Sequence, residues 1–269
     1  MELAAPDLAN VSADAAEAKR FHPVNASREV PIFSYHMYDS YRHEEAPLGF
    51  GEMRARQAAL GRYLREELPG KRVWMTESTG AQWNTKEWHT LGWRPKMDEH
   101  DKALAAARYL HAVLVDAQGS AFLWWGLAYS LPPPTVQGEE ERQKFRDEGL
   151  VLVGHEKKGG VHPYAERTPK YYTFKQFARF IRPGWVRLEV KASALPLVAA
   201  FRSPDSRQVA VVALNPDKSP RALEPRVSGG AAYRLARVYV TDRKHRCEEV
   251  PWTGSLTAES VTTLIYEAG

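Results

Sequence analysis

The stretch from Lys71 to Ser78 constrains the fold more than any other part of the chain. It follows a Pro69-Gly70 break, runs through four residues suited to a strand, and closes on the carboxylate Glu77. A short apolar run of this kind is typical of a buried parallel strand that delivers an acid to the carboxyl edge of a sheet. Buried Glu is rare unless it is paired, so Glu77 is either a structural charge beside a Lys or Arg, or a working carboxylate.

Strand-like and helix-like segments alternate along the first half of the chain. The expected strands are residues 2–8, 30–38, 71–78 and 120–130, and the expected helices are residues 13–21, 50–68 and 101–118. This alternation indicates a parallel sheet with crossover helices. A (β/α)8 barrel and a doubly wound sheet both bind ligands at the carboxyl ends of their strands, where this chain carries polar and aromatic residues.

The pattern changes after the proline run at residues 132–134. Residues 138–158 are rich in charge and read as solvated, with one short apolar segment at residues 150–153. Arg142 and Arg146 lie in the loop expected there, either as solvated surface residues or as contacts to an acidic sugar. A helix is expected over residues 170–181, ended by Pro183 and Gly184. Short alternating strands then predict an antiparallel β-domain of sandwich type. These strands are residues 186–190, 197–202, 208–215, 233–241 and 260–266.

Composition narrows the possible partners. The 269 residues carry a net charge of +4 without a long basic block, so a nucleic-acid partner is not indicated. No apolar run is long enough to span a membrane, and the N-terminus lacks the features of a signal peptide. A single cysteine, Cys247, provides neither an intrachain disulfide nor a metal cluster, and no phosphate-binding glycine motif is present.

Four stretches together resemble glycoside hydrolase family 30, a group of retaining β-glycosidases. Residues 74–77 (Trp-Met-Thr-Glu) resemble the family's nucleophile strand, and residues 34–38 (Ser-Tyr-His-Met-Tyr) resemble the strand before it. Residues 171–184 resemble the last barrel helix and its exit, which is the longest and most specific match. Residues 259–264 resemble the last strand of the side β-domain. The resemblance covers nearly the whole chain and implies a (β/α)8 barrel followed by a β-sandwich.

The resemblance also implies the site residues. Glu77 takes the role of catalytic nucleophile, and His36 and Tyr38 match the His-x-Tyr of the strand before it. Independently of the resemblance, Trp83, Trp124 and Trp125 are candidate sugar platforms, because ring faces stack on pyranose faces. The alternatives are a hydrogen-bonded core histidine for His36 and loop anchoring for Trp83. Trp124 and Trp125 are adjacent, so at most one of them faces the barrel mouth. The chemistry needs only carboxylates and water, so no metal or organic cofactor is implied.

The acid/base residue of the family is not found in the chain. It is expected in an Asn-Glu pair three strand–helix units before Glu77, which requires about 94 residues in a barrel of ordinary size. Only 76 residues precede Glu77, and none of them forms an Asn-Glu pair. The expected fold class is therefore α/β plus all-β, with a partial TIM barrel of about strands five to eight over residues 1–184 and a β-sandwich over 185–269.

Two functions follow from this reading. The first is a retaining O-glycosyl hydrolase acting on a β-linked polysaccharide or glycoside, truncated at its N-terminus and inactive or weakly active as an isolated chain. The second is a non-catalytic carbohydrate-binding or remnant protein. A full-length relative is expected to be secreted, while the glycan and the oligomeric state are left open.

Overall fold

The chain divides into two compact units in a computed structural model. The structure describes residues 4–8, 15–36, 50–78, 97–131, 139–154, 164–191, 196–228 and 232–269. One unit comprises Met1–Met97 with Tyr109–Glu166, and the other comprises Asp98–Arg108 with Arg167–Gly269. We refer to them as the parallel unit and the antiparallel unit, after their main sheets. The domain boundary expected at residues 184/185 stays a prediction.

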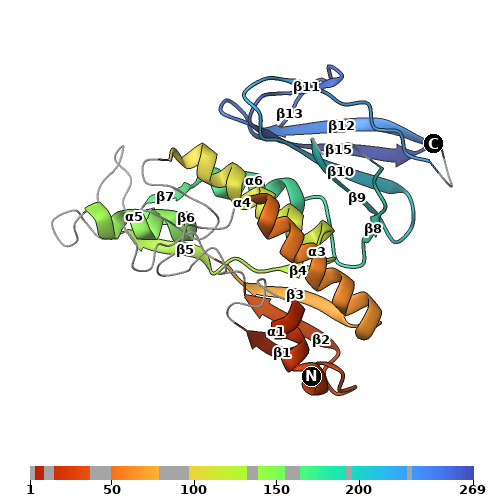
Figure 1. The fold of residues 1–269 in the computed structure, drawn as a ribbon. Coiled ribbons are helices and arrows are strands. Elements are labelled where there is room, and N and C mark those ends of the chain that lie inside the picture. Colours follow the sequence, from red (N-terminus) through yellow and green to blue (C-terminus); the bar gives the residue numbers. More distant parts are fainter. Residues whose placement is uncertain are drawn as a thin grey trace. The chain divides into compact units, whose positions relative to one another are not determined.

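A four-stranded parallel sheet forms the centre of the parallel unit, as the alternation predicts (Figure 1). Its strands, in spatial as well as chain order, are β1 (Ala4–Leu8), β2 (Ile32–His36), β3 (Arg72–Glu77) and β4 (Ala121–Phe122). The connecting helices are α1 (Ala15–Arg20), α2 (His22–Asn25), α3 (Phe50–Glu67) and α4 (Glu99–Val115). The boundary between the two compact units falls within α4.

Strand β2 is buried almost throughout, which explains its continuous apolar sequence. Ile32, Phe33 and Tyr35 are each at most 1% exposed, as expected for an inner strand of a parallel sheet that is covered on both faces. The hydroxyl of Tyr35 donates a 2.7 Å hydrogen bond to the side-chain oxygen of Gln57 on α3. This bond satisfies two buried polar groups and connects the strand with a helix.

Helix α3 packs closely against the segment that follows α4. A Cβ atom at Gly61 would lie only 2.5 Å from the backbone oxygen of Asp116, so glycine is required for this approach. Beside it, the guanidinium of Arg54 donates two hydrogen bonds of 2.7 and 2.9 Å to the carboxylate of Asp116. Such a two-point contact fixes orientation as well as distance.

The single strand expected over residues 120–130 is wrong. Pairing with β3 ends at Phe122, and the chain then enters β5 (Gly126–Leu131), which pairs in parallel with β6 (Gly149–Gly154) in a separate three-stranded sheet completed by β7 (Tyr164–Arg167). An apolar run predicts an extended segment, but it does not show where the hydrogen-bonding partner changes.

The solvated loop expected around Arg142 and Arg146 is also wrong for the residues that the structure describes there. Residues Glu139–Glu148 form helix α5, which includes Arg142 and Arg146 and leads directly into β6. Arg142 is 2% exposed and Asp147 is 1% exposed. Charge density suggested a surface, whereas tertiary contacts bury part of this segment.

The antiparallel unit contains a six-stranded sheet, in agreement with the antiparallel pattern expected from the sequence (Figure 1). Its spatial order is β13 (Arg246–Glu249), β12 (Tyr233–Thr241), β15 (Ser260–Ala268), β10 (Gln208–Asn215), β9 (Leu197–Arg202) and β8 (Val186–Leu188). Strands β11 (Arg221–Ala222) and β14 (Ser255–Leu256) form a second, two-stranded sheet. Helix α6 (Pro169–Ala178) precedes β8, and Gly184 between them has a φ of +86°, a conformation that favours glycine.

Both faces of the six-stranded sheet are covered by apolar side chains. One face packs Val209, Val211 and Leu264 against residues near β11, including Leu223. The other face packs Tyr239 and Ile265 against the segment after α6. The coarse prediction of an α/β region followed by an antiparallel β-domain is therefore confirmed, while closure of a barrel and the sandwich arrangement remain proposals.

Candidate active site

The site begins with a pair of side chains at the carboxyl edge of the parallel sheet. His36 ends β2, Glu77 ends β3, and the two residues are partners in the strand register. The imidazole Nε2 lies 3.7 Å from a carboxylate oxygen of Glu77, and these side chains are 17% and 27% exposed. They form an ion pair when the histidine is protonated, and both remain accessible to a ligand.

An irregularity in the strand pairing helps to orient Glu77. Met75 pairs with Tyr35 and Glu77 pairs with His36, so Thr76 is an extra residue between the two pairs. The hydroxyl of Thr76 donates a 3.2 Å hydrogen bond to the backbone oxygen of Tyr35, which holds this bulge in place. A bulge changes the direction of the side chains that follow it. Met75 is fully buried, whereas Glu77 reaches the partly open edge.

The chain beyond β4 continues alongside β3 and brings the two tryptophans to the same edge. The backbone N–H of Leu123 donates to the oxygen of Met75, and that of Trp125 donates to the oxygen of Ser78, both at 2.9 Å. Trp125 is therefore placed beside the residue that follows Glu77. Its side chain is 54% exposed, whereas Trp124 is half-buried.

The indole of Trp124 is held by a backbone group. Its N–H donates a hydrogen bond to the carbonyl oxygen of Glu148 at the end of α5. Of the two adjacent tryptophans, Trp125 offers the larger surface to a ligand. Tyr38 and Trp83, the other aromatic residues expected at the site, lie outside the described residues.

Tyr129 and Glu148 were missed by the sequence reading. Burial raises the pKa of the Tyr129 phenol to about 12, and the neighbouring negative charge of Glu148 acts in the same direction. The signal in the sequence was an acid directly before a strand that begins with glycine, but the charged run around Glu148 concealed it.

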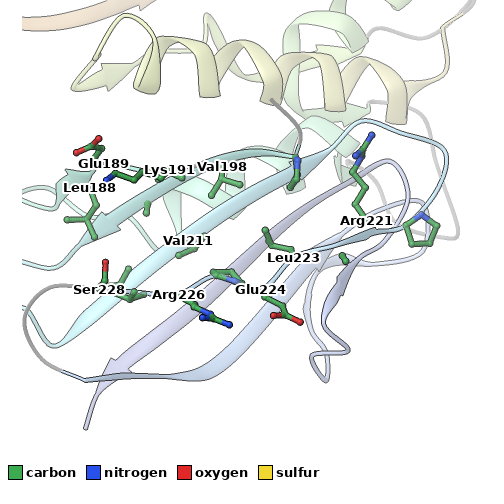
Figure 2. A pocket seen from close by; sticks show the side chains of 18 residues that line it. Leu188, Glu189, Lys191, Val198, Val211, Arg221, Leu223, Glu224, Arg226 and Ser228 are labelled. Carbon is green, nitrogen blue, oxygen red and sulfur yellow. The ribbon is translucent and has the colours of Figure 1, made fainter. Parts of the chain in front are cut away.

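A second concave region lies in the antiparallel unit, with a cavity volume of about 1120 Å³. Figure 2 shows Val198, Val211 and Leu223 among its lining side chains, with Glu224 and Arg226 nearby. The described lining contains aliphatic, proline and charged residues and no aromatic ring.

Two further properties limit the chemistry of the described residues. No group of three or more His, Cys, Asp or Glu side chains among them is arranged to hold a metal ion. Within the same residues, no helix combines the length and apolar character needed to cross a bilayer. Cys247 is buried, and burial raises the pKa of its thiol, which disfavours the reactive thiolate.

Curated relatives by sequence are glucuronoxylanases. Glucuronoxylanase XynC of Bacillus subtilis is 21% identical over 205 residues, which cover 74% of this chain and 40% of that protein. XynC of Bacillus subtilis strain 168 is 22% identical over 211 residues, covering 75% of this chain and 41% of that protein. The chain thus spans about two fifths of the length of these relatives. No profile of a known protein family matches it.

Solved structures of similar fold include family 30 enzymes. A conserved exported protein from Bacteroides fragilis has a TM-score of 0.70 at 15% identity, covering 98% of this chain and 55% of that one. The catalytic domain of GH30 xylanase C from Talaromyces cellulolyticus has a TM-score of 0.63 at 19% identity, covering 99% and 52%. A GH30 endoxylanase from Clostridium papyrosolvens C71 has a TM-score of 0.57 at 18% identity, covering 99% and 56%. The curated relatives support the assignment of the chain to glycoside hydrolase family 30, at low sequence identity, and the solved structures show the same fold.

Proposed function

We propose that the chain carries the nucleophile side of a retaining β-glycosidase site, with Glu77 as the nucleophile and a β-linked polysaccharide of the xylan class as substrate. The observation that carries this proposal is the pairing of Glu77 with His36 at the carboxyl edge of a parallel sheet. The glucuronoxylanase and xylanase relatives support the choice of substrate. The chain spans only part of their length, so the substrate and the activity of a whole protein belong to this proposal.

In the proposed reaction, a carboxylate oxygen of Glu77 attacks the anomeric carbon of the sugar. The bond from that carbon to the leaving oxygen breaks, and a covalent glycosyl ester forms on Glu77. Water then cleaves the ester and restores the carboxylate. His36 lies 3.7 Å from that carboxylate and forms an ion pair with it when the imidazole carries a proton.

The second carboxyl of a retaining site protonates the leaving group from about 5–5.5 Å away. We assign that role to no residue of the described chain. Loss of general acid help costs roughly 10²–10⁴-fold in rate for a poor leaving group, but it costs little when the leaving group departs as a stable anion. An activated substrate therefore tests Glu77 separately from its acid partner.

The remaining parts of the proposal follow from this chemistry. Carboxylates and water suffice, so no cofactor is required. The partner is a carbohydrate, and Trp125 provides an exposed ring on which a pyranose can stack. A longer protein of this kind is expected to act outside the cell, because one structural relative is described as an exported protein.

The test uses the full chain and 2,4-dinitrophenyl 2-deoxy-2-fluoro-β-xylobioside, which traps a glycosyl ester. Mass spectrometry of peptides after incubation is expected to find the fluorinated disaccharide on Glu77. Glu77→Gln should take up no label, while Glu66→Gln, which changes an exposed carboxylate on α3, should be labelled like the wild type.

Labelling at another carboxylate, or equal labelling of Glu77→Gln, would contradict the nucleophile assignment. Binding of xylo-oligosaccharide without any labelling would instead favour the second candidate function, a non-catalytic carbohydrate-binding protein. That candidate also draws on the exposed ring of Trp125.

A further inference from the structure

Three cations lie along one side of helix α6, next to strand β13 of the antiparallel unit. Tyr172, Lys175 and Arg179 follow one another at spacings of three and four residues, so they share one side of the helix. Helix α6 contacts β13, and the guanidinium of Arg246 on β13 lies over the ring of Tyr172, 5.7 Å from its centroid. Arg246 therefore continues the line of Lys175 and Arg179, and we call these three cations the basic row.

Hydrogen bonds fix the helix against the sheet at this point. The side-chain amide of Gln176 donates to the hydroxyl of Thr241 at 2.8 Å, and that hydroxyl donates to the backbone oxygen of Tyr172 at 3.3 Å. Thr241 is the register partner of Arg246. The place of Arg246 beside the helix is therefore set by backbone pairing and by contacts of α6 with the sheet.

Both arginines of the basic row are exposed, and aromatic rings support them. The guanidinium of Arg179 lies over the rings of Tyr239 and Phe180, 4.8 and 5.2 Å from their centroids. A guanidinium held over a ring still has N–H groups at its edges, and these can donate two parallel hydrogen bonds to a carboxylate. The rings thus restrict the arginines without using their donors.

Within the part of the chain that the structure describes, the basic row forms no ion pair with a carboxylate. The two acids of β13 accept other donors: Glu249 accepts from the hydroxyl of Tyr239 at 2.9 Å, and Glu248 accepts from the backbone N–H of Arg246 at 3.3 Å. These acids lower the local net charge. A ligand must therefore be recognised by directed hydrogen bonds to the guanidinium groups, and net charge alone would hold it weakly.

Stabilisation of the helix explains only part of the basic row. Lys175 and Arg179 lie at the C-terminal end of α6, where cations interact favourably with the helix dipole. Arg246 comes from another element and has no such role. Seven residues separate Tyr172, under Arg246, from Arg179, which corresponds to about 10 Å along the helix. A ligand with carboxylates at intervals along its length suits this spacing better than one with a single acid group.

We propose that the basic row is a binding surface for a polysaccharide that carries carboxylates, with Arg246 and Arg179 binding two of its acid groups and Lys175 lying between them. The inference rests on the proposed function, because it takes the polymer to be a xylan with uronate side groups. A neutral xylan offers no carboxylate to these donors. Nucleic acid is disfavoured, because its binding depends on neutralising many phosphates and two acids accompany these three cations.

The test measures binding of the full chain to glucuronoxylan and to the same polymer after chemical reduction of its carboxyl groups. The double variant Arg179→Gln/Arg246→Gln removes both guanidinium groups. Arg207→Gln and Arg207→Gln/Arg237→Gln are the controls, since they remove one and two exposed charges from the same unit outside the basic row.

Calorimetry at low salt is expected to show a Kd for glucuronoxylan about fivefold higher in the double variant than in the wild type. Both controls should stay within about twofold of the wild type. The carboxyl-reduced polymer should not distinguish the double variant from the wild type. The difference between the double variant and the wild type should disappear at about 1 M salt, where charges are screened beyond roughly 3 Å.

Several results would overturn the basic row as a site for acidic polysaccharide. These are an unchanged Kd in the double variant, an equal loss in the controls, or an equal loss with the carboxyl-reduced polymer. Tighter binding of a single-stranded oligonucleotide than of glucuronoxylan, lost in the same double variant, would assign the surface to nucleic acid instead. Labelling of Glu77 by the neutral fluoroxylobioside involves no uronate, so it decides the proposed function separately from the basic row.

Discussion

The main sheets of the two units use their edges differently. In the parallel unit, neighbouring strands end side by side, and His36 and Glu77 are register partners at that edge. In the antiparallel unit, neighbouring strands end at opposite edges, and the charged residues there form ion pairs. Arg243 contacts Asp98, Asp101 and Glu259, each at 2.7 or 2.8 Å.

This difference shows why charge alone does not identify a site. The Arg243 cluster has more charge than the His36–Glu77 pair, yet its hydrogen bonds lie between its own members. The pair at the parallel edge has an exposed aromatic ring nearby and a separation that leaves both side chains partly open. Parallel strands bring side chains together at one edge of the sheet, and we therefore place the candidate active site in the parallel unit.

The largest expected effect is on covalent labelling by the activated fluoroxylobioside. Glu77→Gln removes the attacking carboxylate, so the labelling rate should fall by roughly 10³-fold or more. Arg243→Ala, at the other charged cluster, should leave the rate within about twofold of wild type, the scatter expected for a residue that does not take part in the reaction. A comparable loss in Arg243→Ala would break the contrast between the two clusters.

The next effect concerns the cores. Met75→Ala should lower the free energy of unfolding by about 2–5 kcal/mol, because Met75 is fully buried and its loss leaves a cavity. Met75→Leu, close in volume, should cost less than about 1.5 kcal/mol. Hydrogen exchange in β3 and in β10 measures the effect on each sheet. If hydrogen exchange were accelerated equally in both sheets, the two units would unfold together. The two sheets would then differ in what their edges carry but not in stability.

A smaller effect is expected from the ion pairs of the antiparallel unit. Arg243→Ala should destabilise it by about 1 kcal/mol, at the upper end for exposed pairs because one guanidinium serves three carboxylates. The loss should shrink as salt is added. Arg207→Ala is a matched control, since its side chain is 84% exposed and lies 3.9 Å from Asp205. Urea titration at low and high salt measures the free energy of unfolding of both variants. If both variants lose the same amount, the Arg243 cluster stabilises the protein no more than a single exposed ion pair.

The smallest effect is a dependence on acid. The hydrogen bond from Arg243 lowers the pKa of Glu259. Burial opposes a lowered pKa at Asp98, but hydrogen bonds from the Asp101 backbone and from Arg243 outweigh it. A carboxylate whose pKa is lower in the folded state than in the unfolded state stabilises the folded state at any pH above its unfolded-state pKa. This stabilisation is lost as the pH falls through the folded-state pKa, below about pH 4.

This acid sensitivity should be weaker in Arg243→Ala, because the ionised carboxylates lose their partner. Free energies of unfolding measured between pH 6 and pH 3 test it. Identical pH profiles for the variant and the wild type would show that the Arg243 cluster does not set the acid response of the antiparallel unit.

Local sequence patterns determined most of the secondary structure. Strands β9, β10 and β12 begin and end at the expected residues, because alternating side chains bounded by turn residues define an antiparallel strand locally. Helix α3 and strand β3 were also expected, from an apolar stripe and from an apolar run that ends at a break. Glu77 was singled out on the same local basis, and its catalytic role stays a proposal.

Tertiary structure alone decided where strands change partners and how the candidate site is assembled. Residues 120–131 are mainly apolar, but their hydrogen bonds pass from β3 to β6 within a few residues. The bulge at Thr76 and the hydrogen bond from the Trp124 indole to the Glu148 carbonyl depend on contacts between residues distant in sequence. Local patterns record the preference of a segment for water or for the interior, whereas pairing and orientation depend on which other segment occupies the interior beside it.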